Sequence, residues 1–255
     1  MLRTGEHLSK HEIAAAYAAL GERRGLGEKF RSLVLDLAGN LGSKKVLDVG
    51  CGYGELLSQA ASAYQGAEFF GIDYSPERVK ESGLARVKTQ RVDIEEERFP
   101  FEDAFFDVIF CTEVLEHLRE PAGCFREIRR VLKTGGRVIF TVPNGDGFFP
   151  FNRLPGIVPG RWLRSKLLPY EHPENTDQPV DTCFEYEEII GLIKGGGFSV
   201  EKISGWRYFR YLQMLPVFRI FYGLLEAPLE AFMNRFGSKR YAYNLFLVCS
   251  KSNGA

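Results

Sequence analysis

The stretch that decides the fold is KKVLDVGCGYGELL, residues 44–57. A run of apolar and β-branched residues is followed at once by three glycines within five positions, Gly50, Gly52 and Gly54. A simple turn needs one glycine or two, so the third indicates that something comes very close to this backbone. In an open parallel sheet, the loop after the first strand lies beyond the carboxyl ends of the strands, where ligands bind. We therefore expect a ligand-binding loop here.

The composition favours a single large core. The chain has 255 residues, of which 45% are hydrophobic, and its 33 basic residues balance its 33 acidic residues. No overall basic field points to nucleic acid. The five cysteines are scattered without a CxxC pair, which is typical of reduced thiols. With no visible signal peptide or transmembrane run, we expect a cytoplasmic protein.

Strand and helix patterns alternate along most of the chain. Predicted strands cover residues 45–50, 67–73, 85–93, 105–111, 137–143, 198–204 and 242–251. Predicted helices cover residues 11–39, 54–66, 75–83, 121–136 and 184–197. Short, nearly continuous apolar strands separated by helices indicate a parallel sheet with helices on both faces. We therefore expect an α/β domain in residues 44–255, preceded by a cap of N-terminal helices in residues 1–43.

Two segments interrupt the alternation and are expected to be insertions. Residues 144–182 are rich in Pro, Gly and Asn and predict a long loop or small cap. Residues 205–240 are aromatic and helical in pattern, and Pro216 and Pro228 should split them into short helices. Their aromatic and arginine content suits a peripheral membrane contact, a lipid-tailed substrate or a homodimer interface. A pair of helices packed on the sheet is the plainer interpretation.

Two acidic residues follow the glycines in register. Asp73 ends the second predicted strand, and Asp93 ends the third. An acid at the end of the second strand can accept hydrogen bonds from both hydroxyls of a ribose. An acid at the end of the third can take the exocyclic amine of an adenine. Each acid alone could be a loop cap, but together with the glycines they predict a nucleoside cofactor.

Four motifs then resemble the class I S-adenosylmethionine-dependent methyltransferases, in order and in spacing. They are VLDVGCGYG, GIDYSPE, DIEEERFPFEDAFFDVIFCTEVLEHL and EIRRVLKTGGRVIFTVPN. The resemblance covers residues 40–145 closely and residues 184–250 by pattern, and it lies nearest to the ubiquinone-type O-methyltransferases. It implies a Rossmann-like, mostly parallel sheet of seven strands with the last strand antiparallel. Insertions would follow strands five and six, and S-adenosylmethionine would be the cofactor.

The same resemblance implies which residues contact the cofactor. The glycines would line its methionine part, and Asp48 would orient their loop near the ammonium. Asp73 would hold the ribose, while Asp93 and the backbone of Ile94 would bind the adenine. Two further residues, just past the fourth strand, would face the sulfonium. The full expected set is Asp48, Gly50, Cys51, Gly52, Gly54, Asp73, Tyr74, Asp93, Ile94, Cys111 and Thr112.

The loop after the fourth predicted strand carries Glu113, Glu116 and His117 in the pattern E-x-x-E-H, and we expect these residues to be catalytic. If the segment is helical, positions i, i+3 and i+4 share one face. Such oxygen and nitrogen donors suit Mg, Mn or Zn, with His172 as a fourth ligand. The arrangement is similar to that of ubiquinone-pathway O-methyltransferases and small-RNA 3′-end 2′-O-methyltransferases, for which a metal is implied. His117 could instead be a metal-free base, or the carboxylates could merely favour a helix start.

The expected function is methyl transfer from S-adenosylmethionine to a small-molecule acceptor. The favoured acceptor group is a hydroxyl, on a quinone precursor, catechol, sugar or lipid-linked compound. An RNA 2′-O-methyltransferase is the main alternative, and the absence of a basic excess counts against it. An NAD(P)-dependent oxidoreductase and a non-catalytic cofactor-binding module are more remote alternatives. The glycine spacing argues against the first of these, and the intact TEVLEH segment against the second.

Overall fold

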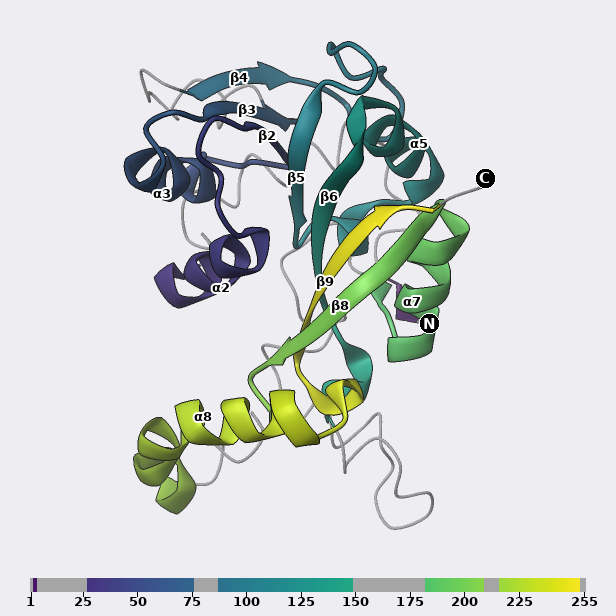
Figure 1. Cartoon of the computed structure of the whole chain (residues 1–255). Coiled ribbons are helices and arrows are strands. Elements are labelled where there is room, and N and C mark those ends of the chain that lie inside the picture. The colour runs from purple at the N-terminus through teal and green to yellow at the C-terminus, as the bar shows by residue number, and fades with distance from the viewer. Residues whose placement is uncertain (1, 4–26, 76–86, 149–181, 209–215, 253–255) are drawn as a thin grey trace.

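The computed structural model describes residues 2–3, 27–75, 87–148, 182–208 and 216–252. Within them, seven strands form one sheet in the spatial order β4-β3-β2-β5-β6-β9-β8 (Figure 1). The strands are β2 (Lys45–Val49), β3 (Glu68–Asp73), β4 (Val87–Arg91), β5 (Phe106–Thr112), β6 (Leu132–Pro143), β8 (Phe198–Trp206) and β9 (Asn244–Lys251). Strand β9 is antiparallel to both of its neighbours, and the other pairs are parallel. The predicted seven-stranded, mostly parallel sheet is confirmed.

Helices cover both faces of this sheet (Figure 1). They are α2 (Glu28–Ala38) and α3 (Glu55–Ala63) on one face, and α5 (Pro121–Val131) and α7 (Tyr186–Gly195) on the other. Successive side chains of a strand point to opposite faces. In β2, Val46 therefore belongs to the apolar layer under α2 and α3, and Leu47 belongs to the layer under α5 and α7. This explains why β2 is apolar after Lys45, apart from Asp48.

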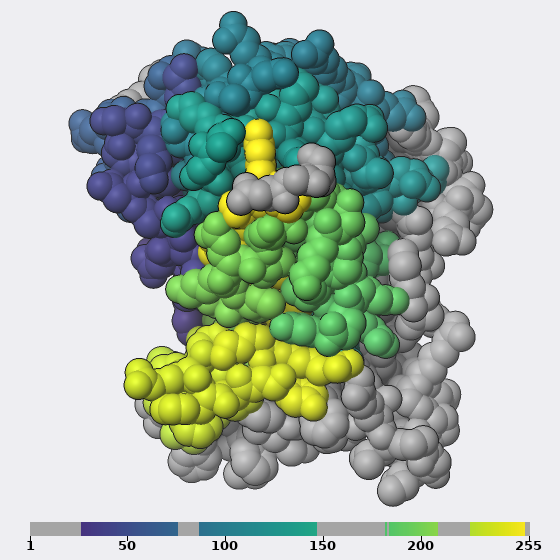
Figure 2. All heavy atoms as spheres, turned by 45° about the vertical axis from the view of Figure 1, so that its right-hand side comes forward, coloured from purple at the N-terminus to yellow at the C-terminus, as the bar shows by residue number. Residues whose placement is uncertain are grey.

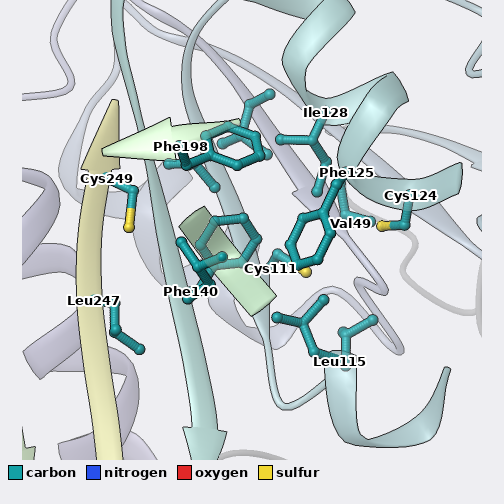
Figure 3. Close-up of a cluster of buried hydrophobic side chains, with 14 of the residues drawn as sticks. Val49, Cys111, Leu115, Cys124, Phe125, Ile128, Phe140, Phe198, Leu247 and Cys249 are labelled. Atoms are coloured by element: carbon teal, nitrogen blue, oxygen red, sulfur yellow. The ribbon is translucent and has the colours of Figure 1, made fainter. Parts of the chain in front are cut away.

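Aromatic rings fill the layer between the sheet and α5 (Figure 3). The ring of Phe140 on β6 lies 5.6 Å from that of Phe125 on α5 and 5.5 Å from that of Phe198 on β8, both edge to face. Such pairs add about 0.5–1.5 kcal/mol each beyond the burial of their area. Through Phe140, strand β8, which lies beyond the antiparallel strand β9, is connected to α5, the helix that also packs on the parallel strands.

Helix α2 packs directly on the sheet. The ring of Phe30 lies 5.6 Å from that of Trp206 on β8 and 4.9 Å from that of Phe246 on β9. The helix ends at Ala38, just before Gly39, whose φ of 71° suits glycine. The division into a cap and a methyltransferase domain stays a prediction, but this last helix of the predicted cap shares the main core.

Several element boundaries differ from the predictions. The helix predicted over residues 121–136 ends at Val131, and residues 132–136 already belong to β6, with an irregular register against β5. The chain leaves the helical conformation at Leu132, whose φ of −73° and ψ of 136° are extended. Gly135, with a φ of 76°, also lies outside the helical region. The predicted helix over residues 75–83 and the first part of the one over residues 11–39 lie outside the described residues.

The described part of the insertion after β8 contains helix α8 (Pro216–Phe236), followed by the short turn η6 (Lys239–Tyr241). The predicted break at Pro228 is wrong, because Pro228 lies inside the helix, whereas Pro216 is its first residue. A proline inside a helix costs about 3 kcal/mol, and the two hydrogen bonds between the Asn234 side chain on α8 and the Gly205 backbone on β8 act against that cost. None of the described helices is both long and apolar enough to cross a membrane.

The insertion after β6 is described only at its two ends. It begins with the turn η3 (Gly145–Phe148) and ends with β7 (Thr182–Cys183), which pairs with β1 (Leu2–Arg3) in a small antiparallel sheet. The predicted cap function of residues 144–182 falls mostly outside the described residues.

Candidate cofactor and acceptor site

The glycine loop joins β2 to α3, and its first two glycines are needed there for different structural reasons. Gly50, Gly52 and Gly54 have φ values of 76°, 54° and 76°, in the region that favours glycine. A Cβ atom on Gly50 would lie 2.4 Å from Cγ2 of Val114, so the neighbouring loop already fills the space there. A Cβ atom on Gly52 would meet nothing within 4 Å. The first glycine is needed for packing, whereas the second borders open space.

Asp73 fastens this loop to the end of β3. Its Oδ2 accepts a hydrogen bond from the backbone N–H of Gly52 at 2.9 Å, and its Oδ1 accepts one from the backbone N–H of Ser75 at 2.9 Å. The carboxylate is buried, and such charge-assisted bonds are among the stronger ones in proteins. Asp73 therefore shapes the predicted cofactor site, and its contact with a ribose stays a prediction.

Asp48 is the buried acid beneath the glycine loop. It is 2% exposed, and among the described residues its Oδ1 has no hydrogen-bond partner. Burial, and then the nearby charge of Asp73, raise the pKa of the Asp48 carboxyl well above its ordinary value. Leaving such a group without a partner is costly. A cationic ligand group would relieve that cost, so this carboxyl fits the ammonium of S-adenosylmethionine.

The remaining residues predicted to bind the cofactor lie at neighbouring strand ends. Asp93 follows β4 and accepts a hydrogen bond on Oδ1 from the backbone N–H of Glu95 at 3.1 Å, which shapes the turn around buried Ile94. The Arg91 guanidinium lies 5.0 Å from the ring of Tyr74. Cys51, within the glycine loop, and Cys111 and Thr112, at the end of β5, are all buried. The carboxyl ends of β2 to β5 therefore gather the predicted cofactor residues at one edge of the sheet.

The acceptor loop, residues 113–118, follows β5 and begins with an unusual conformation. Glu113 has a φ of 52°, which is uncommon for a residue other than glycine. Its Oε1 accepts a hydrogen bond from the Thr141 hydroxyl at 3.0 Å, and its Oε2 accepts one from the Asn244 amide at 3.3 Å. Only residues 115–117 form a helical turn, η2. The predicted alignment of Glu113 with Glu116 and His117 requires a common helical face. That face does not form, because Glu113 turns toward β6 and β9.

Glu116 and His117 lie together in η2. The Glu116 carboxylate is almost fully buried, and its Oε1 lies 3.9 Å from Nε2 of His117, whose side chain is 22% exposed. In the part of the chain that the structure describes, no three His, Cys, Asp or Glu side chains are placed to hold a metal ion. His172, the predicted fourth ligand, lies outside the described residues. Metal binding stays a prediction.

Three residues that the sequence did not single out hold the acceptor loop and its surroundings. Thr141 and Asn244 bind Glu113, as described above. Asn144, directly after β6, donates its side-chain amide to the carbonyl oxygens of Arg240 and Ala242 at 2.8 and 2.7 Å. The Arg240 side chain also forms an ion pair with Asp146 at 2.9 Å. The sequence feature that could have pointed to Thr141 and Asn144 is the TVPN motif at the end of β6, where polar residues interrupt an apolar strand.

The sheet order, the glycine loop and the acids at the strand ends are those of a Rossmann-like methyltransferase, and comparisons with known proteins agree. Residues 47–140 match the family model described as a methyltransferase domain. The ubiquinone biosynthesis O-methyltransferase of Xylella fastidiosa (strain 9a5c) is 33% identical over 66% of this chain and 66% of that protein. The protein of the same name from Pseudomonas syringae pv. tomato is 38% identical over 68% of this chain and 72% of its own length.

A solved structure supports the fold. The S-adenosylmethionine-dependent methyltransferase from Mesorhizobium loti superposes with a TM-score of 0.58 at 16% identity, covering 86% of this chain and 96% of that one. The matches with sequence relatives span about two thirds of the relatives' lengths. Together these findings show that the chain belongs to the methyltransferase family that contains the ubiquinone biosynthesis O-methyltransferases. The protein is an S-adenosylmethionine-dependent methyltransferase, and membership of this family does not favour the RNA or NAD(P) alternatives.

Proposed function

We propose that this enzyme methylates a hydroxyl group of a small aromatic acceptor of the quinone-precursor type. The relatives named above support the acceptor class, because they are ubiquinone biosynthesis O-methyltransferases. The observation in this chain that carries the proposal is the contact between Val114 and Gly50, which sets the acceptor loop against the glycine loop. An acceptor held by residues 113–118 would therefore lie beside the cofactor.

The cofactor supplies an activated methyl group, so the protein mainly has to align the acceptor and exclude water. We assign the cofactor to Asp48, the glycine loop, Asp73 and Asp93, as predicted. The open space beside Gly52 and the buried Asp48 Oδ1, which has no hydrogen-bond partner among the described residues, support this assignment.

A hydroxyl acceptor has to lose its proton as the methyl group arrives. We assign this proton to His117, whose side chain is partly exposed and therefore accessible to an acceptor. The buried Glu116 carboxylate, 3.9 Å away, would stabilise the imidazolium that results. Glu113 would position the loop, since Thr141 and Asn244 hold its two carboxylate oxygens. A divalent metal on Glu116 and His117 remains the alternative arrangement of the same groups.

The test is a methyl-transfer assay with radiolabelled S-adenosylmethionine and a panel of catechols, hydroxybenzoates and matched anilines. We expect label on an oxygen of the catechol or hydroxybenzoate ring, with the position read by mass spectrometry and NMR. The matched control is the same acceptor with its hydroxyl already methylated, which should take no label. Transfer to the anilines but not to the phenols would contradict the proposal.

A further inference from the structure

A polar cavity lies at the amino ends of the strands, opposite the glycine loop. Its volume is about 290 Å³, and it is lined by residues 38–40 at the end of α2, Lys44 before β2, Asp107 on β5 and residues 133–137 of β6. Strands β2, β5 and β6 run parallel, so their amino ends meet here, about 20 Å from the carboxyl ends that carry the cofactor site. In the space-filling view, the purple to teal residues that include this lining form the upper part of the molecule, and yellow α8 lies at the lower end (Figure 2). The cavity is therefore separate from the site of methyl transfer and from the insertion after β8.

Asp107 is the single carboxylate among the described residues that line this cavity, and both of its oxygens are already engaged. Oδ1 accepts a hydrogen bond from Nζ of Lys133 at 2.7 Å, and Oδ2 accepts one from the backbone N–H of Lys45 at 2.9 Å. Burial raises the pKa of the Asp107 carboxyl, but these hydrogen bonds outweigh it and bring the pKa below its ordinary value. Asp107 is therefore ionised at neutral pH, and Lys133 neutralises its charge.

Two further cationic residues, Lys44 and Arg137, line the same cavity. Within the described part of the chain, neither of them forms an ion pair with a carboxylate. With Lys133, the lining holds three cationic side chains and one carboxylate, an excess of two positive charges. Like charges gathered around one cavity repel one another, and an anion inside the cavity would turn that repulsion into attraction.

Two glycines leave the walls of the cavity open. A Cβ atom on Gly39, after α2, or on Gly135, in β6, would meet nothing within 4 Å. Both residues therefore border open space, and a ligand can approach the backbone there. Asn40 and Thr134, beside these glycines, add hydrogen-bonding side chains to the lining. Because Oδ1 of Asn40 accepts the backbone N–H of Gly42 at 2.9 Å, its NH₂ group is the part that serves as a donor.

We propose that this cavity binds a phosphate group, as free orthophosphate or as a small phosphate monoester, between Lys44 and Arg137. A phosphate group carries a charge of about −1.5 to −2 at pH 7, which matches the excess of two positive charges. The planar fork of an arginine binds two phosphate oxygens at once, and a lysine ammonium adds a point charge. A volume of about 290 Å³ is near the lower end of the range for small-molecule sites and suits a compact ligand. A carboxylate, with one negative charge, would leave one of the cations uncompensated.

The test is isothermal titration of the full chain with orthophosphate and with glucose 6-phosphate, at constant ionic strength. We expect the double variant Lys44→Gln, Arg137→Gln to weaken phosphate binding at least tenfold, because two charge-assisted hydrogen bonds are lost. The matched control, Lys194→Gln with Lys202→Gln, removes the same net charge at exposed positions outside the cavity and should bind like the wild type. Binding of orthophosphate alone would identify the free ion as the ligand, and equal or tighter binding of glucose 6-phosphate would identify a monoester. Either result supports the site.

The phosphate site goes beyond the proposed chemistry, and the two fail separately. The double variant should bind S-adenosylhomocysteine like the wild type, and saturating S-adenosylhomocysteine should leave phosphate affinity unchanged. The phosphate proposal is overturned if the wild type binds neither compound at millimolar concentrations, or if the control variant loses as much affinity as the double variant. It is also overturned if acetate binds as tightly as orthophosphate, or if S-adenosylhomocysteine displaces the phosphate, because the anion would then occupy the cofactor site.

Discussion

Asn244, the first residue of β9, donates its side-chain amide to the carboxylate of Glu113, which lies 131 residues earlier in the chain. The Thr141 hydroxyl on β6 holds the other oxygen of that carboxylate. Glu113 has a positive φ, a conformation that costs about 1–3 kcal/mol and persists only where its surroundings enforce it. The start of the acceptor loop is thus fixed by two strands that carry none of the predicted catalytic residues.

Asn244→Leu should loosen the acceptor loop while the cofactor still binds. The change keeps the side-chain size and removes the Asn244 donor from a partly buried carboxylate oxygen of Glu113, so we expect a loss of about 1–2 kcal/mol in the free energy of unfolding. Turnover should fall, and S-adenosylhomocysteine affinity in calorimetry should not. Asn244→Asp is a second check, because it sets two carboxylates together and its stability deficit should grow as pH rises from 5 to 8. A deficit independent of pH would contradict the contact.

Gly50→Ala and Gly52→Ala should separate packing from ligand binding. At Gly50, the clash with Val114 and the positive φ should together cost about 2–4 kcal/mol in urea unfolding. Adding Val114→Ala should restore part of that loss. At Gly52 only the conformational cost of about 1–2 kcal/mol is expected, but the new methyl group enters the ligand space and should lower S-adenosylhomocysteine affinity. Equal stability losses in the two variants would be inconsistent with this division.

Asp73→Ala should weaken cofactor binding at least tenfold. The loss combines the predicted ribose hydrogen bonds, about 1.5–3 kcal/mol each at most, with the loosening of the loop at Gly52. Isothermal titration with S-adenosylhomocysteine measures it. Asp36→Ala, an exposed acid on α2, is the matched control and should bind like the wild type. An unchanged affinity in the Asp73 variant would remove this residue from the site.

Asp48→Asn should change how stability depends on pH. Burial raises the folded-state pKa of Asp48 above the unfolded value of about 3.9. A carboxyl with a raised pKa favours the folded state at low pH, and this advantage is lost as pH rises from about 4 through the raised pKa. The wild type should therefore lose stability relative to Asp48→Asn over that range in parallel thermal melts. The amide should also weaken S-adenosylhomocysteine binding, and a stability difference constant with pH would count against the shift.

His117→Ala and Glu116→Ala should each reduce turnover by about a hundredfold or more, because general-base catalysis contributes about 10²–10⁴-fold. S-adenosylhomocysteine affinity should change little, and Glu120→Ala, an exposed acid nearby, should behave like the wild type. Chelation decides between the two arrangements. Activity that is lost on chelation and restored by Mg, Mn or Zn identifies a metal site. Activity that survives chelation leaves His117 as the direct base. Normal turnover in both variants would end the catalytic assignment.

Local signals explain why most of the fold was predictable. The apolar run of β2, the glycines behind it and Asp73 lie within 30 residues of one another, and each reports on its own surroundings. The number of strands and the antiparallel last strand came from family resemblance. The spatial order of the strands was not predicted, because no local pattern states that β9 inserts between β6 and β8.

The errors have long-range causes. The sequence pattern placed Glu113 on a helical face with Glu116 and His117, but hydrogen bonds from residues 28 and 131 positions away turn it elsewhere. Pro228 was expected to end a helix, yet contacts of Asn234 with β8 accompany a helix that continues through it. Both outcomes depend on contacts between residues that are far apart in the chain, and local sequence patterns do not reveal such contacts.

The place of β9 in the sheet has a consequence for synthesis on the ribosome. Strand β9 is the last of the seven in chain order, yet it pairs with β6 on one side and β8 on the other. Until Asn244 has left the exit tunnel, β6 has a bare edge and Glu113 lacks the hydrogen bond from the Asn244 amide. In a nascent chain the glycine loop can therefore form before β9 is made, whereas the acceptor loop is complete only once β9 has closed the sheet.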